Sequence, residues 1–111
     1  NMDCRIDGAQ IDNKSRGNYL FNTTIAGIEE ADALLIIGAN PRVEAPIVNQ
    51  RIRKRWRAGK FPIARIGAAA NLTYDYEDLG DTPEILSEIA SGKHAFAKVL
   101  KSAKKPMIIV G

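Results

Sequence analysis

The fold of this chain is decided by one stretch of its sequence, Asp32-Ala33-Leu34-Leu35-Ile36-Ile37-Gly38. After the aspartate comes a continuous run of five apolar residues, and a glycine closes it. A run of this kind is typical of a strand that is covered on both faces in a parallel sheet. We therefore predict that residues 33–37 form the central strand.

Helices are expected before and after this strand. Upstream, two possible N-caps precede apolar residues at helical spacing, namely Asn22 and Thr23 followed by Ile25, Ile28 and Ala31. Downstream, Pro46 suits a first helical turn, where a missing N–H is tolerated. A stripe of apolar residues four apart follows as far as Gly59, formed by Val48, Ile52 and Trp56. We predict a short helix upstream and a helix of about three turns downstream.

The second half of the chain repeats this alternation. Residues 61–67 have the pattern of a shorter, partly polar strand, expected nearer an edge because a proline stands close to its start. Asp81 and Glu84 form a possible capping box for a helix that Ser91-Gly92 ends. A further helix is indicated by Phe96, Val99, Leu100 and Ala103. Residues 105–111 have the pattern of a buried strand that runs into a glycine turn.

The order helix, strand, helix, strand, helices, strand predicts an α/β fold. Such alternation implies right-handed crossovers, so we expect a three-layer, Rossmann-like parallel sheet of about three strands with flanking helices. Residues 1–21 are predicted to be an irregular segment, and residues 22–111 a partial α/β domain. Because the chain opens at Asn1 and stops after a strand, we expect a truncated part of a larger domain, prone to self-association along an unpaired sheet edge.

Length and composition suit one globular domain. The 111 residues are 45% hydrophobic and 26% charged, with a net charge of +3. The longest apolar runs are far shorter than the roughly 20 residues that a membrane-spanning helix needs. The single cysteine, Cys4, can neither form an intramolecular disulfide nor hold zinc or an iron–sulfur cluster by itself, which indicates a reducing compartment.

The loop after the central strand is a candidate ligand site. Ligands gather at the carboxyl ends of parallel strands where connections diverge, and the candidates at that place are Gly38, Asn40, Pro41 and Arg42. Glycine allows close approach of a phosphate, and the following helix offers a partly positive N-terminus. The loop has neither the Gly-x-Gly-x-x-Gly nor the Gly-x-x-x-x-Gly-Lys-Ser/Thr pattern, so a plain strand-ending turn is favoured over a cofactor site.

The densest positive charge lies in residues 51–57, a candidate docking surface for a partner protein. Its cations are Arg51, Arg53, Lys54, Arg55 and Arg57. Basic runs can bind nucleic acid, anionic lipid or an acidic protein surface. Helical spacing turns Ile52 and Trp56 inward and leaves the cations outside, so a solvated face is favoured first and protein docking second. Nucleic acid is disfavoured because no base-stacking aromatic residues are interleaved with the exposed cations.

No catalytic or metal site is predicted. His94, the single histidine, has no cysteine or carboxylate at a helical ligand offset, and we expect it at the surface. An acidic cluster consists of Asp75, Glu77, Asp78 and Asp81, with Tyr74 and Tyr76 between them. Its pattern resembles a solvated loop that caps a helix more than a catalytic pair of carboxylates. Cys4 has no base beside it in the sequence and is not expected to act as a nucleophile.

Five stretches of the chain carry a family resemblance: residues 1–5, 19–32, 38–46, 49–54 and 71–74. Taken in order, they resemble the large iron–sulfur subunit of respiratory NADH:quinone oxidoreductase, also called complex I. Separate stretches in one order are more specific than a single short motif, and the match spans nearly the whole chain. The resemblance is to the long C-terminal part of that large subunit, which is similar to molybdopterin oxidoreductases.

The resemblance implies a structural and assembly segment that supports electron transfer from NADH to quinone without an active site of its own. In the molybdenum relatives an Asn-Pro loop after a strand contacts the pterin dinucleotide, and Asn40 and Pro41 match that pattern. The respiratory subunits have lost that cofactor, so the resemblance carries no binding over to these residues. The segment is thus expected to be part of an NADH dehydrogenase but inactive alone, with no cofactor of its own, while the parent chain holds iron–sulfur clusters.

The resemblance also implies partners and a location. The partners are other subunits of the hydrophilic arm, and the membrane is reached only through the parent complex. The location is the cytoplasmic side of a bacterial inner membrane or, alternatively, the matrix side of the mitochondrial inner membrane. Two other functions stay open. The first is a residual nucleotide or pterin binder that uses the loop at residues 38–42. The second is a nucleic-acid module, which is less favoured because a net charge of +3 is ordinary for a soluble domain.

Overall fold

The predicted central strand is confirmed. In the computed structural model, β1 (Ala33–Ile37) lies inside a four-stranded sheet of order β3-β2-β1-β4 whose pairings are all parallel. It pairs with β2 (Ile63–Ile66) on one side and with β4 (Pro106–Val110) on the other. The first four of its residues are buried, as expected for a strand that is covered on both faces.

The structure describes residue 12, residues 14–18 and residues 20–111. The predictions for Cys4 and for most of the irregular segment 1–21 therefore lie outside the described residues. Within the described part of that segment, a short 3-10 turn, η1, covers Arg16–Asn18.

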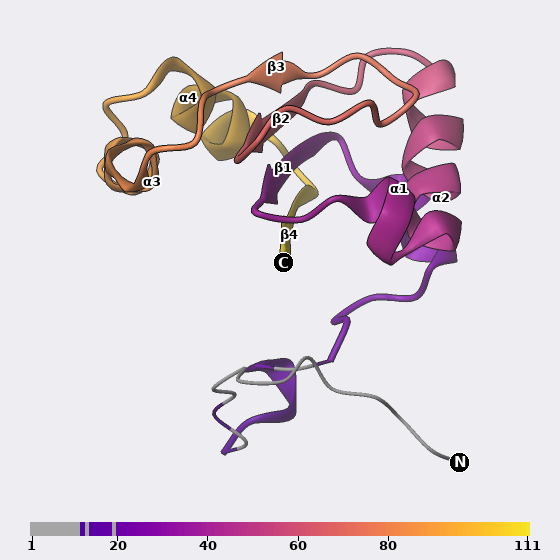
Figure 1. The fold of residues 1–111 in the computed structure, drawn as a ribbon. Coiled ribbons are helices and arrows are strands. Elements are labelled where there is room, and N and C mark those ends of the chain that lie inside the picture. Colours follow the sequence, from indigo (N-terminus) through magenta and orange to yellow (C-terminus); the bar gives the residue numbers. More distant parts are fainter. Residues whose placement is uncertain (1–11, 13, 19) are drawn as a thin grey trace.

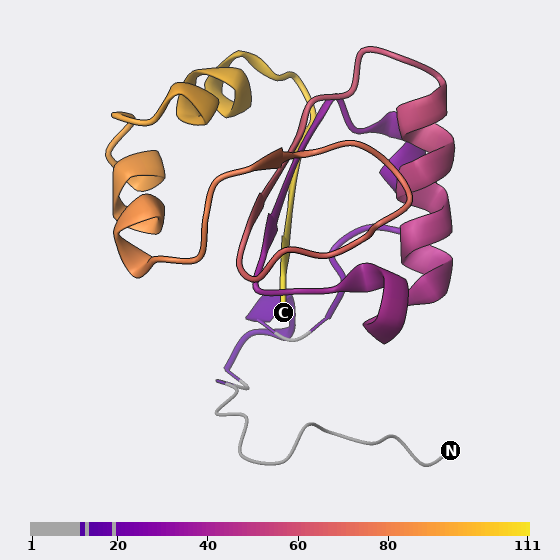
Figure 2. The same cartoon turned by 45° about the horizontal axis from the view of Figure 1, so that its top comes forward.

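The sheet is the middle of three layers, as the alternation of elements predicted. Helix α2 (Pro46–Arg57) covers one face together with the 3-10 helix η2 (Ala26–Glu30). Helices α3 (Pro83–Ala90) and α4 (Ala95–Ser102) cover the other face, and Figure 2 shows the strands standing between the two groups.

Each face of the sheet has its own hydrophobic core. The core under α2 and η2 is built mainly from Ile28, Leu34, Ile36, Ile52, Phe61, Ile63, Leu72 and Tyr74. The core under α3 and α4 is smaller, with Leu35, Ala64, Ile66 and Phe96 as its buried members. Successive residues of β1 and β2 alternate between these two cores, which is why both strands are apolar throughout except for Arg65.

The predicted place of β2 near an edge was wrong. A further strand, β3 (Glu77–Asp78), pairs with its outer side through Ala64 and Arg65, so β2 lies inside the sheet and is buried along its whole length. Both residues of β3 are exposed acids, a composition that gives no strand signal. The pairing follows from the return of the loop across β2, which no local pattern reveals.

Three details of the helices also differ from expectation. Residues 26–30 form a 3-10 helix rather than an α-helix. A separate turn, α1 (Pro41–Glu44), precedes the confirmed helix α2. The predicted capping box of α3 does not form, because Pro83 begins the helix, so the N-cap is Thr82 and Glu84 falls at the second helical position, one short of the position a capping box needs.

Candidate functional site

The candidate loop, residues 38–42, lies where the carboxyl ends of three strands meet, and it joins β1 to α1 in Figure 1. The Gly38 N–H donates to Ile66 O of β2, and the Gly111 N–H donates to Ile37 O of β1, both at 2.9 Å. A Cβ on Gly111 would stand 2.8 Å from the backbone of Ala39. The ends of β1 and β4 therefore pack backbone against backbone at Ala39 and Gly111.

Two donors of this loop are bonded within the chain, the Asn40 N–H and the Arg42 guanidinium. The backbone N–H of Asn40 donates to Glu44 Oε1 at 2.8 Å. The guanidinium of Arg42 donates through Nη1 to Asn71 O at 3.0 Å. Pro41 is buried and has no N–H to offer. Asn40 Oδ1 is the exception among these atoms, since it is buried and has no partner within the described residues.

Arg65 is a central residue of this region that sequence reasoning missed. It lies on β2 and is only 3% exposed. Its Nε donates to Ala39 O at 3.3 Å, and its Nη1 donates to Gly67 O at 3.0 Å and to Ala68 O. No carboxylate of the described residues forms an ion pair with it. The only sequence signal was a charged residue inside an otherwise apolar strand.

A second buried polar network fastens the loop after β2 to α2. Asn49 is 2% exposed, donates through Nδ2 to Leu72 O at 3.0 Å, and accepts at Oδ1 from the Tyr74 hydroxyl at 2.9 Å. Burial raises the pKa of Tyr74 well above its usual range, so the hydroxyl keeps its proton as the donor. Tyr76 adds a further contact, because its hydroxyl donates to Ala70 O at 2.8 Å.

The cations of the predicted docking helix fall into two groups, those that bind other parts of the fold and those that do not. Arg51 and Lys54 both form ion pairs with Glu29 of η2, the second at 2.7 Å. Arg55 donates through Nε to Ala31 O at 2.7 Å and lies 4.8 Å above the centre of the Phe61 ring. These three cations fasten α2 to the elements beside it.

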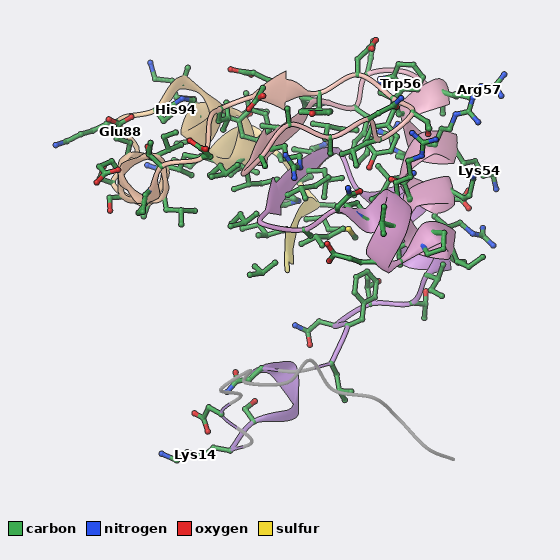
Figure 3. All side chains as sticks on the ribbon, in the orientation of Figure 1. Lys14, Lys54, Trp56, Arg57, Glu88 and His94 are labelled. Carbon is green, nitrogen blue, oxygen red and sulfur yellow. The ribbon has the colours of Figure 1, made fainter. Side chains whose placement is uncertain are left out.

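Arg53 and Arg57 pair with no carboxylate among the residues that the structure describes. Together with Gln50 and Lys54 they line a shallow groove of about 240 Å³. Arg53 Nε is buried and has no hydrogen-bond partner in the described part of the chain. Figure 3 shows Lys54 and Arg57 pointing away from the sheet, whereas Trp56 lies on the side of α2 that faces the sheet.

His94 serves the start of a helix. It is the N-cap of α4, and its Nδ1 accepts from the Phe96 N–H at 3.1 Å. Its side chain was expected at the surface, but the residue is partly buried. Among the described residues, no group of three or more His, Cys, Asp and Glu is placed to hold a metal ion.

Acid is expected to destabilise the contacts that hold η2 and β4. Hydrogen bonds from Lys54 and then Arg51 lower the pKa of Glu29 below its ordinary value of 4.5, and a hydrogen bond from Lys105 lowers that of Glu30. For Asp32, desolvation acts to raise the pKa, but the backbone N–H groups of Lys104 and Lys105 outweigh it, and the pKa falls.

A depressed folded-state pKa stabilises the fold above the unfolded-state value, and that stabilisation is lost as the pH falls through the folded-state value. We expect the free energy of unfolding, measured in urea, to be constant near neutral pH and to drop below about pH 4.5. Glu29→Gln should flatten part of this drop, and Glu88→Gln, at an exposed glutamate outside these contacts, should not. An equal pH dependence in wild type and Glu29→Gln would contradict the assignment.

Comparison with known proteins matches the whole chain, residues 1–111, to the family model described as molybdopterin oxidoreductase. The chain is 57% identical over 102 residues to the NADH-quinone oxidoreductase G subunits of Rickettsia felis and of Rickettsia bellii. The identity to the corresponding protein of Rickettsia prowazekii is 53% over 102 residues. These alignments cover 92% of this chain and 15% of the relatives, so the chain spans a small part of their length. Among the described residues, no helix has the length and apolar character needed to cross a membrane.

Proposed function

The chain belongs to the molybdopterin oxidoreductase family, and from that premise we propose that it is a structural and assembly segment of an NADH-quinone oxidoreductase subunit. In this proposal the segment supports electron transfer from NADH to quinone and carries no active site. The observation that carries it is the hydrogen bonding of the loop at residues 38–42, which lies where parallel α/β folds bind their ligands. There the Asn40 N–H and the Arg42 guanidinium donate to acceptors of the chain itself, and Arg65 of β2 donates to Ala39 O.

The residues of this loop do not fit the anionic pterin cofactor that the family name implies. A phosphate needs N–H donors, yet the Asn40 N–H is held by the carboxylate of Glu44, which would itself repel an anion. The guanidinium of Arg42 is turned to Asn71 O, and that of Arg65 to three loop carbonyls. The contact between Gly111 and Ala39 leaves no room for a side chain at position 111.

The remaining parts of the proposal concern the parent protein. The parent chain holds the iron–sulfur clusters, and this segment supports the cluster-bearing part and the neighbouring subunits of the hydrophilic arm. The complex lies at the cytoplasmic side of a bacterial inner membrane, where the segment itself does not enter the bilayer. The names of the rickettsial relatives support a parent subunit of an NADH-quinone oxidoreductase, and the clusters, the neighbouring subunits and the location are what the resemblance of five separate stretches implies.

The test separates a chemical role of the loop from a structural one. Asn40→Ser and Arg42→Gln are introduced into the full-length protein, and NADH:quinone turnover is measured per assembled complex, with assembly followed by native gel. We expect turnover per complex within twofold of wild type. A loss of tenfold or more in fully assembled complex would show that the loop takes part in the chemistry and would overturn the proposal.

A residual nucleotide or pterin binder is the second candidate, and one observation favours it. Asn40 Oδ1 is a buried acceptor with no partner among the described residues, as expected where a ligand amino group is missing. Calorimetric titration of the full-length protein with guanosine diphosphate tests this candidate. Saturable binding that Asn40→Ser abolishes would establish it, and no saturable signal up to millimolar concentration would dismiss it.

The isolated 111-residue chain is expected to self-associate along β4. Within the described residues this strand is paired on one side only, and its Ile108 and Val110 are 56% and 70% exposed. We expect light scattering to show a mass that rises with concentration, and Ile108→Lys to reduce that rise. Lys98→Glu, a charge change on α4, is the control. A monomer at all concentrations would contradict this prediction.

A further inference from the structure

We propose that the outer face of α2 docks an acidic helix of a neighbouring subunit. This docking face consists of Ile47, Gln50, Arg53, Lys54 and Arg57 of α2, together with Val43 of the preceding turn α1. The inference rests on the proposed function and adds the surface and the chemistry of its partner. It narrows the basic run of residues 51–57 by leaving out Arg51 and Arg55, which are used inside the fold. Lys54 stays in the face because its side chain is 65% exposed although it pairs with Glu29. The inference also adds apolar residues that the charge pattern did not include.

The spacing of these residues makes them one continuous stripe. Ile47, Gln50, Lys54 and Arg57 follow one another at intervals of three, four and three residues, so they lie on one side of the helix. Arg53 stands three residues from Gln50 and four from Arg57, and it shares their groove. At 1.5 Å per residue the stripe is about 15 Å long, which matches roughly three turns of a second helix lying beside it.

The charge of this face is unbalanced within the described residues. Among the described residues, Glu29 is the one carboxylate that forms an ion pair with a cation of α2, and Arg51 and Lys54 share it. In the same part of the chain, Arg53 and Arg57 pair with no carboxylate, and the buried Nε of Arg53 has no hydrogen-bond partner. A carboxylate entering the groove would accept from these guanidinium groups, which bind carboxylates with particular strength. Charge complementarity therefore calls for an acidic partner.

Two large apolar side chains distinguish a protein partner from nucleic acid. Ile47 is 63% exposed at the N-terminal end of the stripe, and Val43 is 74% exposed on α1, which precedes it. An aliphatic anchor beside cations is the composition of a protein interface, in which an apolar centre has a charged rim. Phosphate backbones gain nothing from such anchors, and Trp56, the aromatic residue of this helix, packs against the core instead of facing outward.

The spacing of the two arginines points to a helical partner. Arg53 and Arg57 are four residues apart, a rise of about 6 Å along α2. Acidic residues four apart on a second helix have the same rise, so two carboxylates could meet both guanidinium groups at once. An apolar residue one to two turns away on that helix would then reach Ile47.

The test places a photo-crosslinking amino acid at position 47 of the full-length protein in the assembled complex, and at position 98 as the control. Lys98 is exposed on α4, on the opposite face of the sheet. We expect position 47 to crosslink to another subunit, within a segment that has acidic residues three or four apart. Position 98 should not give that product. Crosslinks to RNA or lipid from position 47, or none, would overturn the inference.

A pair of charge variants provides a second measurement. Arg53→Glu with Arg57→Glu should reduce recovery of the subunit in the complex at least tenfold, whereas the matched pair Lys98→Glu with Lys101→Glu should not. Circular dichroism establishes that each variant folds. If the wild-type protein assembles and the Arg53 and Arg57 pair assembles equally well, the docking face is wrong and the proposed function stands. If the wild-type protein is absent from the complex, the proposed function fails as well.

Discussion

Replacing Arg65 with methionine is expected to lower the free energy of unfolding by about 3 kcal/mol, because three loop carbonyls, one of them on the buried residue Ala39, lose their shared donor. Methionine keeps most of the volume, so the effect reports the lost hydrogen bonds rather than a cavity. The loops after β1 and β2 should loosen together, since the guanidinium contacts both. Urea unfolding measures the stability, and hydrogen exchange of the Gly38 and Gly67 amides measures the loops.

Two further variants make the Arg65 prediction specific. Arg65→Lys keeps the charge but loses the planar fork, so it should be intermediate in stability. Arg57→Met makes the same replacement on the exposed face of α2 and should change the stability by less than about 0.5 kcal/mol. If Arg65→Met were as stable as Arg57→Met, the bonds from Arg65 to the loop carbonyls would contribute nothing, and the account of this region would be wrong.

Asn49→Ala is expected to lower the free energy of unfolding by about 2 to 3 kcal/mol, because it leaves Leu72 O and the Tyr74 hydroxyl buried without their partner. Tyr74→Phe should cost about 1 kcal/mol, since it removes one hydrogen bond and leaves one acceptor partly unsatisfied. Because the two residues contact each other, the double variant should cost less than the sum of the single variants. Urea unfolding of the four proteins gives the coupling.

The neighbouring Gln50 supplies the control for this network. It is exposed one residue further along α2, so Gln50→Ala should change the stability by less than about 0.5 kcal/mol. Strict additivity of Asn49→Ala and Tyr74→Phe would mean that the buried hydrogen bond between them does not contribute to stability.

Both predictions concern residues that hold loops, and this bears on the proposed function. The carboxyl ends of the strands are stabilised by an internal arginine, and the loop that follows β2 is anchored to α2 by Asn49. Rigid loops of this kind present a fixed surface to neighbouring proteins, as an assembly segment requires. The stretches at residues 38–46, 49–54 and 71–74, which carry the family resemblance, meet here, since the side chains of Arg42 and Asn49 donate to the backbone carbonyls of Asn71 and Leu72.

The sequence by itself determined the layered α/β fold and its central strand. The apolar run at residues 33–37, the stripe of Val48, Ile52 and Trp56, and the glycine after α3 are local signals, because strand burial and helix amphipathicity repeat over a few residues. The loop at residues 38–42 was also placed correctly at the carboxyl end of β1, because parallel strands bring such loops to one edge.

Only the tertiary structure decided which polar residues hold the fold and which remain available to a partner. The strand β3, the cap made by His94, the bonds of Arg65 and the internal use of Arg51 and Arg55 all depend on how the backbone and side chains meet after folding. The local sequence around an arginine or lysine is the same whether or not a distant carbonyl or carboxylate binds it in the folded protein. Most of these contacts join segments that come together only when the sheet forms, so their partners are set by topology and not by local pattern.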